Sequence, residues 1–209
     1  MLRRLFLVCF IALAVAPLAA QAPDGWMVRV DNSTNAADPD DTPKVKFVSM
    51  GKGFHITSGP AGTYWNPSNT AAGNFTAKAT FILFKPSGHT NYYGLTFGGE
   101  ELGTAKQNYI YFMVAQNGTY AIIHRAGDAT HDIQRGKHEA ILQPGADGRS
   151  TNALEVRVAG NNISYVVNGT VVHTSPKSGM TAKTDGIVGV RVNHLLDVHI
   201  DGFQVTKDK

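Results

Sequence analysis

The chain has 209 residues, with 19 Lys and Arg against 16 Asp and Glu, which gives a formal net charge of +3. Its basic residues form no stripe and do not alternate with aromatic side chains, so the composition excludes nucleic acid as a partner. The single cysteine, Cys9, excludes an intramolecular disulfide and thiol catalysis in the domain that follows it. The fold must therefore be stabilised by its own hydrophobic core.

The N-terminus has the three parts of a secretory signal peptide. Arg3 and Arg4 precede an apolar run over residues 5–16, and small residues follow at Ala20 and Ala22. The run is shorter than the ~20 residues of a membrane-spanning helix, although a retained anchor is the alternative. We expect residues 1–22 to be a signal peptide, cleaved after Ala20 or Ala22. Residues 23–209 are then one secreted or periplasmic domain without stable membrane insertion, with 17 basic against 16 acidic residues.

Short β-rich segments separated by turn residues follow a polar stretch at residues 31–43. Residues 74–84 alternate apolar and polar side chains, which is the period of a half-buried strand. Residues 109–125 predict two strands joined at Asn117-Gly118, because this dipeptide tolerates the positive φ of a tight turn. We find no convincing amphipathic helix.

The clearest hairpin lies at residues 153–174, where apolar and charged residues alternate before an Asn-rich turn and a second turn at Asn168-Gly169. Residues 187–193 predict a buried strand. The last strand, residues 197–205, changes phase at Gly202, which predicts a β-bulge. Strands without helical crossovers are antiparallel, and so many of them must pack as two sheets. The sequence thus predicts an all-β, antiparallel two-sheet sandwich.

The order of strands and three sequence segments resemble the concanavalin A-like lectin/glucanase superfamily over residues 26–205. The segments are ALEVRVAGNNISYVVNGTVVHT, GIVGVRVNH and HIDGFQV. Similar domains occur in laminin-G-type modules and in bacterial 3-keto-disaccharide hydrolase-like proteins. The resemblance implies a jelly roll that binds a carbohydrate. The alternatives are a glycoside hydrolase and a structural or adhesive module, because one fold hosts all three.

The acidic residues do not match the Glu-x-Asp-x-x-Glu strand motif of the retaining glucanases in this superfamily. The sequence after residue 22 has four glutamates: Glu100, Glu101, Glu139 and Glu155. Glu100 and Glu101 are adjacent, so on a strand they would point to opposite faces. We therefore assign no catalytic residue, and binding is favoured over hydrolysis.

Metal-ligand patterns are weak in this sequence. His131 with His138 and His194 with His199 follow no standard zinc-ligand spacing, so no catalytic zinc is expected. The acidic cluster at residues 38–41 does not have EF-hand spacing. In similar jelly rolls an Asp on the last strand helps to hold a structural calcium ion against the N-terminal segment, and Asp201 matches that position. The resemblance thus implies Asp201 as a Ca²⁺ ligand.

A sugar-binding surface needs aromatic faces together with amide, guanidinium or imidazole groups. If Ile110 and Phe112 point into the core, alternation places Tyr109 and Tyr111 on the opposite face. Inward-pointing valines on residues 187–193 likewise place Arg191 and Asn193 outward, with Trp65 as a rim platform or a packed loop anchor. The predicted ligand contacts are Tyr93, Tyr109, Tyr111, His124, Arg125, Arg191 and Asn193. The alternative is that the tyrosines cap the core and Arg191 pairs with an acid.

Overall fold

The computed structural model describes residues 22–31 and 44–208. Residues 1–21 of the predicted signal peptide and the acidic cluster at residues 38–41 lie outside these described residues. Within them the chain forms two seven-stranded antiparallel sheets, which confirms the predicted all-β sandwich. The helical structure of the described part is one 3₁₀ turn, Gly179–Thr181, and no helix there could cross a membrane.

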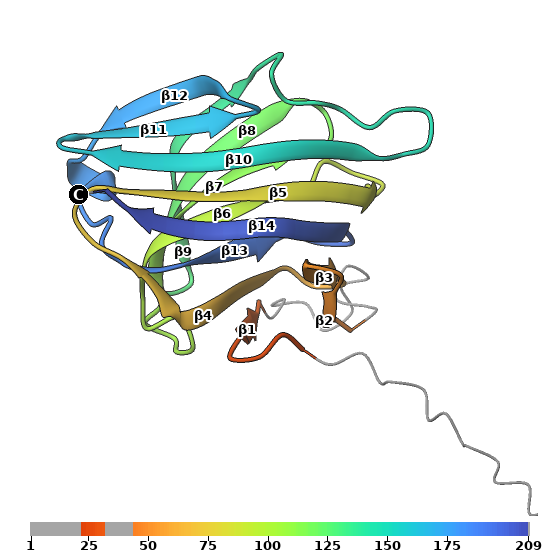
Figure 1. Cartoon of the computed structure of the whole chain (residues 1–209), viewed down its shortest axis with the longest axis horizontal. Coiled ribbons are helices and arrows are strands. Elements are labelled where there is room, and N and C mark those ends of the chain that lie inside the picture. The colour runs from red at the N-terminus through yellow and green to blue at the C-terminus, as the bar shows by residue number, and fades with distance from the viewer. Residues whose placement is uncertain (1–21, 32–43, 209) are drawn as a thin grey trace, which may run out of the picture.

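The two sheets lie over one another, with β10, β5 and β14 in front of β6, β7 and β13 in the view of Figure 1. In spatial order, sheet A consists of β1 (Met27–Val30), β4 (Gly62–Ala71), β13 (Gly186–Val192), β6 (Tyr92–Glu100), β7 (Asn108–Ala115), β8 (Thr119–Ala126) and β9 (Ala129–Lys137). Sheet B consists of β12 (Thr170–Pro176), β11 (Asn162–Val167), β10 (Ser150–Ala159), β5 (Phe75–Lys85), β14 (Asp197–Lys207), β3 (Gly53–Thr57) and β2 (Lys46–Met50).

The hydrophobic core fills the space between the sheets. On β5 every second residue from Phe75 to Leu83 is buried in it, as the alternation in the sequence predicts. Phe112 of sheet A meets Tyr165 of sheet B with ring centroids 5.3 Å apart. Each sheet therefore turns one face inward and leaves its other face, called its outer face below, for other contacts.

Turn residues set the register of the strands. Gly118 has a φ of 81° between β7 and β8, and Asn168 and Gly169 have φ of 50° and 81° between β11 and β12. Both turns confirm the Asn-Gly predictions. The pairing of β14 with β5 shifts between Asp201 and Gln204, and Gly202 has a φ of 60° there. The predicted bulge is therefore confirmed.

Candidate functional site

The outer face of sheet A carries a second apolar cluster, separate from the core. Its buried members are Trp65, Leu102, Tyr109, Tyr111, Met113, Ala121 and Ile123. Ile110 and Phe112 point into the core, so the predicted orientation of Tyr109 and Tyr111 is confirmed. Their exposed fractions are only 0% and 4%, however, so these two rings offer no open surface for stacking. Trp65 belongs to β4 and is buried in the same cluster, as a packed anchor.

Arg191 organises the polar part of this face. Its Nη1 donates to Thr63 Oγ1 at 3.0 Å and to Tyr109 Oη at 3.1 Å, and its Nη2 donates to Asp31. The guanidinium also lies 5.3 Å from the ring centroid of Tyr111. At 5% exposure Arg191 is almost wholly removed from water, so these partners replace the hydration of its two Nη atoms, while its Nε is buried without a hydrogen-bond partner.

Arg125 reaches the same carboxylate from β8. Its Nη1 lies 3.2 Å from Asp31 Oδ2, and its Nε donates to the Gly127 carbonyl at 2.9 Å. Burial by itself raises the pKa of Asp31. The charge and hydrogen bond of Arg191, together with the charge of Arg125, have the larger effect, so the pKa lies below its usual value. Two arginines and one ionised carboxylate thus tie the residue that follows β1 to strands β8 and β13 of the same sheet.

Two of the predicted contacts lie on the other face of sheet A. Tyr93 is buried in the core, where its hydroxyl accepts a hydrogen bond from Asn152 Nδ2 at 3.2 Å. His124 is paired with the inward-pointing Ile110, and its Nε2 lies 3.2 Å from Asn108 Oδ1. The prediction that Tyr93 and His124 line one surface with Tyr109 is therefore wrong. Arg125 does share that surface, because it follows His124 and faces the opposite side.

Tyr92, rather than Tyr93, is the tyrosine of β6 that packs on the outer face. Its ring keeps partial exposure, its hydroxyl lies 3.0 Å from Thr119 Oγ1, and the Arg135 guanidinium lies 5.8 Å from its centroid. Arg135 in turn makes a two-point ion pair with Asp132, at 2.7 and 2.9 Å. The sequence analysis missed Tyr92 because two consecutive tyrosines do not reveal which one points outward.

Asn193 follows β13 directly and lies beside Tyr92. Its backbone N–H donates to the Tyr92 carbonyl at 2.9 Å, while its side-chain Oδ1 is buried without a hydrogen-bond partner. Because that oxygen is shielded from solvent, it offers no open contact for a ligand. We call Tyr92, Asp132 and Arg135 the Tyr92 patch.

Asp201 lines a cavity of about 570 Å³ beside the N-terminal segment. Its Oδ1 accepts the N–H of Gly202 at 2.8 Å, and Lys52 lines the same cavity. Within the ranges that the structure describes, no three His, Cys, Asp or Glu side chains are grouped to hold a metal. Asp24, Asn66 and Asn69 also line the cavity and carry oxygen atoms of the kind that Ca²⁺ prefers, whereas Lys52 brings a competing positive charge. The role of Asp201 as a Ca²⁺ ligand therefore stays a prediction.

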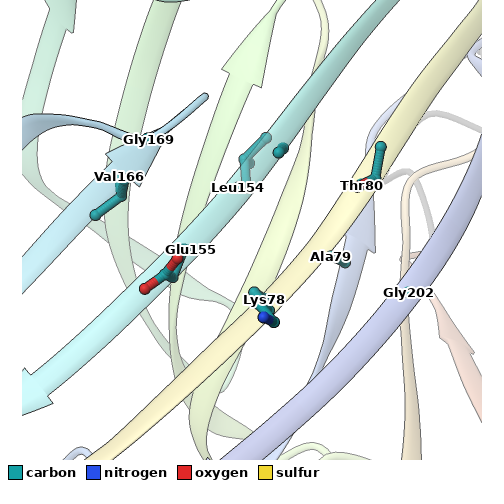
Figure 2. A pocket seen from close by; sticks show the side chains of 9 residues that line it. Lys78, Ala79, Thr80, Leu154, Glu155, Val166, Gly169 and Gly202 are labelled. Carbon is teal, nitrogen blue, oxygen red and sulfur yellow. The ribbon is translucent and has the colours of Figure 1, made fainter.

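A smaller pocket, of about 210 Å³, lies on the outer face of sheet B. Figure 2 shows Lys78 and Thr80 on one strand and Glu155 on the next, with Val166 and Gly202 on either side. Lys78 and Glu155 are directly paired across β5 and β10. The volume is below the ~300 Å³ at which ligand pockets begin, so this pocket is a weak candidate site.

No protein-family model and no curated protein sequence matches the chain. Solved structures that are similar in fold include the following three. The carbohydrate-binding module CBM66 from Bacillus subtilis has a TM-score of 0.64 at 14% identity, over 88% of this chain and 96% of that one. A B. subtilis protein of unknown function with a galectin-like fold has 0.63 at 12%, over 87% and 89%. The endo-β-1,3-glucanase from Pyrococcus furiosus has 0.60 at 11%, over 91% of each chain.

These neighbours are consistent with the predicted concanavalin A-like sandwich, and they confirm its jelly-roll class. At such low identities the similarity is one of fold alone. It transfers no site residue to this chain, because unrelated functions share such folds.

Proposed function

We propose that this protein binds a carbohydrate on the outer face of sheet A, at the Tyr92 patch. The observation that carries the proposal is a partly exposed tyrosine beside an exposed Arg–Asp pair. Sugar C–H groups pack on aromatic faces, and sugar hydroxyls can both donate to Asp132 and accept from Arg135. No charged ligand is required.

The layer beside the patch supports the proposal. Tyr109, Tyr111 and Arg191 are almost fully buried and hold one another through hydrogen bonds and ring contacts. A surface that is already ordered loses less conformational entropy when it binds a ligand. A carbohydrate-binding module and a glucanase are among the proteins that share this fold, which adds support of a general kind.

The acidic residues on the outer face of sheet A favour carbohydrate binding without hydrolysis. Glycoside hydrolysis needs one carboxyl group that stays protonated until it donates to the leaving group. The hydrogen bond and charge of Arg135 lower the pKa of Asp132, and the nearby arginines outweigh the burial of Asp31 to lower its pKa as well. Both carboxyl groups are therefore ionised at neutral pH and unsuited to act as the acid. A glycoside hydrolase and an adhesive module remain the alternatives.

Replacing Tyr92 by alanine is expected to weaken binding of the best ligand from a glycan array by about 1 kcal/mol, or roughly fivefold in Kd. The reason is loss of the only ring face of the patch. Calorimetric titration measures the change. Tyr92→Phe keeps the ring and should retain most of the affinity, although it loses the contact with Thr119.

Three further variants define the results that would contradict the proposal. Asn69 lines the 570 Å³ cavity, and loss of binding in Asn69→Ala with retention in Tyr92→Ala would move the site there. Glu100→Gln and Glu101→Gln should leave binding unchanged, and no reducing sugar should be released on long incubation. If the parent protein releases reducing sugar and either glutamine variant does not, the glycoside hydrolase alternative is favoured.

We also propose that the protein is exported, on the basis of its N-terminal sequence. Protein made in a host that recognises the leader should begin at Gln21 or Pro23, because the small residues Ala20 and Ala22 fit signal peptidase. N-terminal sequencing of the secreted or periplasmic fraction measures this. A soluble cytosolic product that retains Met1 contradicts export.

A further inference from the structure

Two histidines face each other across neighbouring strands on the outer face of sheet B. His55 of β3 is paired directly with His199 of β14, although the two strands come from opposite ends of the domain. Side chains in this relation leave the sheet about 5 Å apart. The ring centroids are 6.0 Å apart and the ring planes differ by 28°.

Asp197 determines which nitrogen of His55 carries the proton. The Asp197 carboxylate contacts Nε2 of His55, and an ionised carboxylate can only accept a hydrogen bond. Nε2 is therefore protonated, and the lone pair is on Nδ1. Both His55 Nδ1 and His199 Nδ1 are buried and have no hydrogen-bond partner. Two imidazole nitrogens thus lack the partner that buried polar atoms normally have.

The spacing of the rings suits a bridging metal ion. A Zn–N bond is about 2.0–2.1 Å long and the nitrogen is about 1.1 Å from the ring centre, so each centroid lies about 3.2 Å from the metal. Two such rings have centroids about 5.2 Å apart at a tetrahedral angle and about 6.4 Å apart when collinear. The observed 6.0 Å falls within this interval.

We propose that His55 and His199 bind a divalent transition-metal ion, represented here by Zn²⁺, through their Nδ1 atoms. Imidazole suits zinc, copper and nickel, and a carboxylate on the other ring nitrogen is the usual outer support of such a ligand. The described residues include no group of three metal-binding side chains, so water completes the coordination. The bound ion ties β3 to β14 and stabilises the native fold by mass action.

His124 and His131 provide a matched control within the same protein. They are also paired directly across two strands, with centroids 6.0 Å apart and ring planes at 27°. His124 Nε2, however, meets the neutral amide of Asn108 in place of a carboxylate, and His131 is exposed. His124 Nδ1 is also buried without a partner, but the pair lacks the charged support and its second ring is not shielded, so it should bind zinc more weakly.

The test is a calorimetric titration of protein without a polyhistidine tag with ZnCl₂. His55→Asn and His199→Asn should each weaken the tightest zinc-binding step by at least about tenfold, and Asp197→Asn by about tenfold, as loss of an outer support does. His124→Asn should leave that step unchanged. Melting curves recorded without zinc identify any variant that has failed to fold.

Imidazole ¹⁵N spectra of the unaltered protein give a readout that needs no variant. Zinc should shift the Nδ1 signals of His55 and His199 before those of any other histidine. The proposal is overturned if neither signal moves, or if the tightest step is lost in His124→Asn and kept in His199→Asn. Neither result bears on sugar binding, which involves the opposite sheet.

Discussion

Replacing Arg191 by methionine is expected to lower the free energy of unfolding by about 3 kcal/mol. The change leaves Asp31 with Arg125 as its remaining close partner and removes the hydrogen bonds to Thr63 and Tyr109. Breaking one side of a buried ion pair typically costs 3–5 kcal/mol, because the other charge stays desolvated. Urea unfolding followed by fluorescence measures the loss.

Arg135→Met is the matched control on the same face. Arg135 makes two hydrogen bonds to Asp132 where Arg191 makes one to Asp31, but the two side chains of the Arg135 pair are 48% and 56% exposed. An exposed pair contributes at most about 1 kcal/mol, so this variant should be nearly as stable as the parent. Adding Asp31→Asn to Arg191→Met should restore part of the stability. Equal losses in the two single variants would show that burial does not strengthen the Arg191 interaction.

The Arg191–Asp31 ion pair also predicts the direction in which the stability of the fold depends on pH. The folded-state pKa of Asp31 is below its unfolded value near 3.8, so the unfolded chain binds the proton more readily. Above the unfolded-state pKa, Asp31 therefore makes its full contribution to the free energy of unfolding. This contribution is lost as the pH falls through the lower pKa of the folded state. Arg191→Met should weaken this acid-range dependence.

Replacing Gly94 by alanine is expected to cost up to about 3 kcal/mol. Gly94 lies in β6, and an added Cβ would come within 2.1 Å of the Phe112 carbonyl oxygen and 2.7 Å of Met113 Cα. Both atoms belong to the backbone of β7, so the two strands would have to separate. Chemical denaturation measures the effect, with Gly88→Ala as control, since a Cβ there meets nothing within 4 Å. Similar stability in both variants would mean that β6 and β7 can separate at little cost.

The sequence identified the outer face of sheet A but not how open it is. Alternation correctly assigned Tyr109 and Tyr111 to one side of β7, because successive side chains on a strand point to opposite faces. It could not show that both rings are covered, since burial depends on neighbouring strands and loops. It also could not choose between Tyr92 and Tyr93, or orient His124 after two consecutive isoleucines, because such runs have no alternation.

The histidines show the same limit. Sequence spacing suggested His194 with His199 and His131 with His138 as the pairs to consider, whereas the structure pairs His199 with His55 and His124 with His131. Residues that face each other across a sheet are set by strand order and register, which contacts along the whole chain determine.

The sequence by itself determined the class of this protein: an all-β sandwich with turns at Asn117-Gly118 and Asn168-Gly169 and a bulge at Gly202. These features are local, because they follow from side-chain period and from the φ values that asparagine and glycine tolerate. Only the tertiary structure decided that Asp31 lies between Arg125 and Arg191, that Tyr92 is the available ring, and that His55 meets His199. Each of these depends on strands distant in the chain becoming neighbours, and on the burial that results.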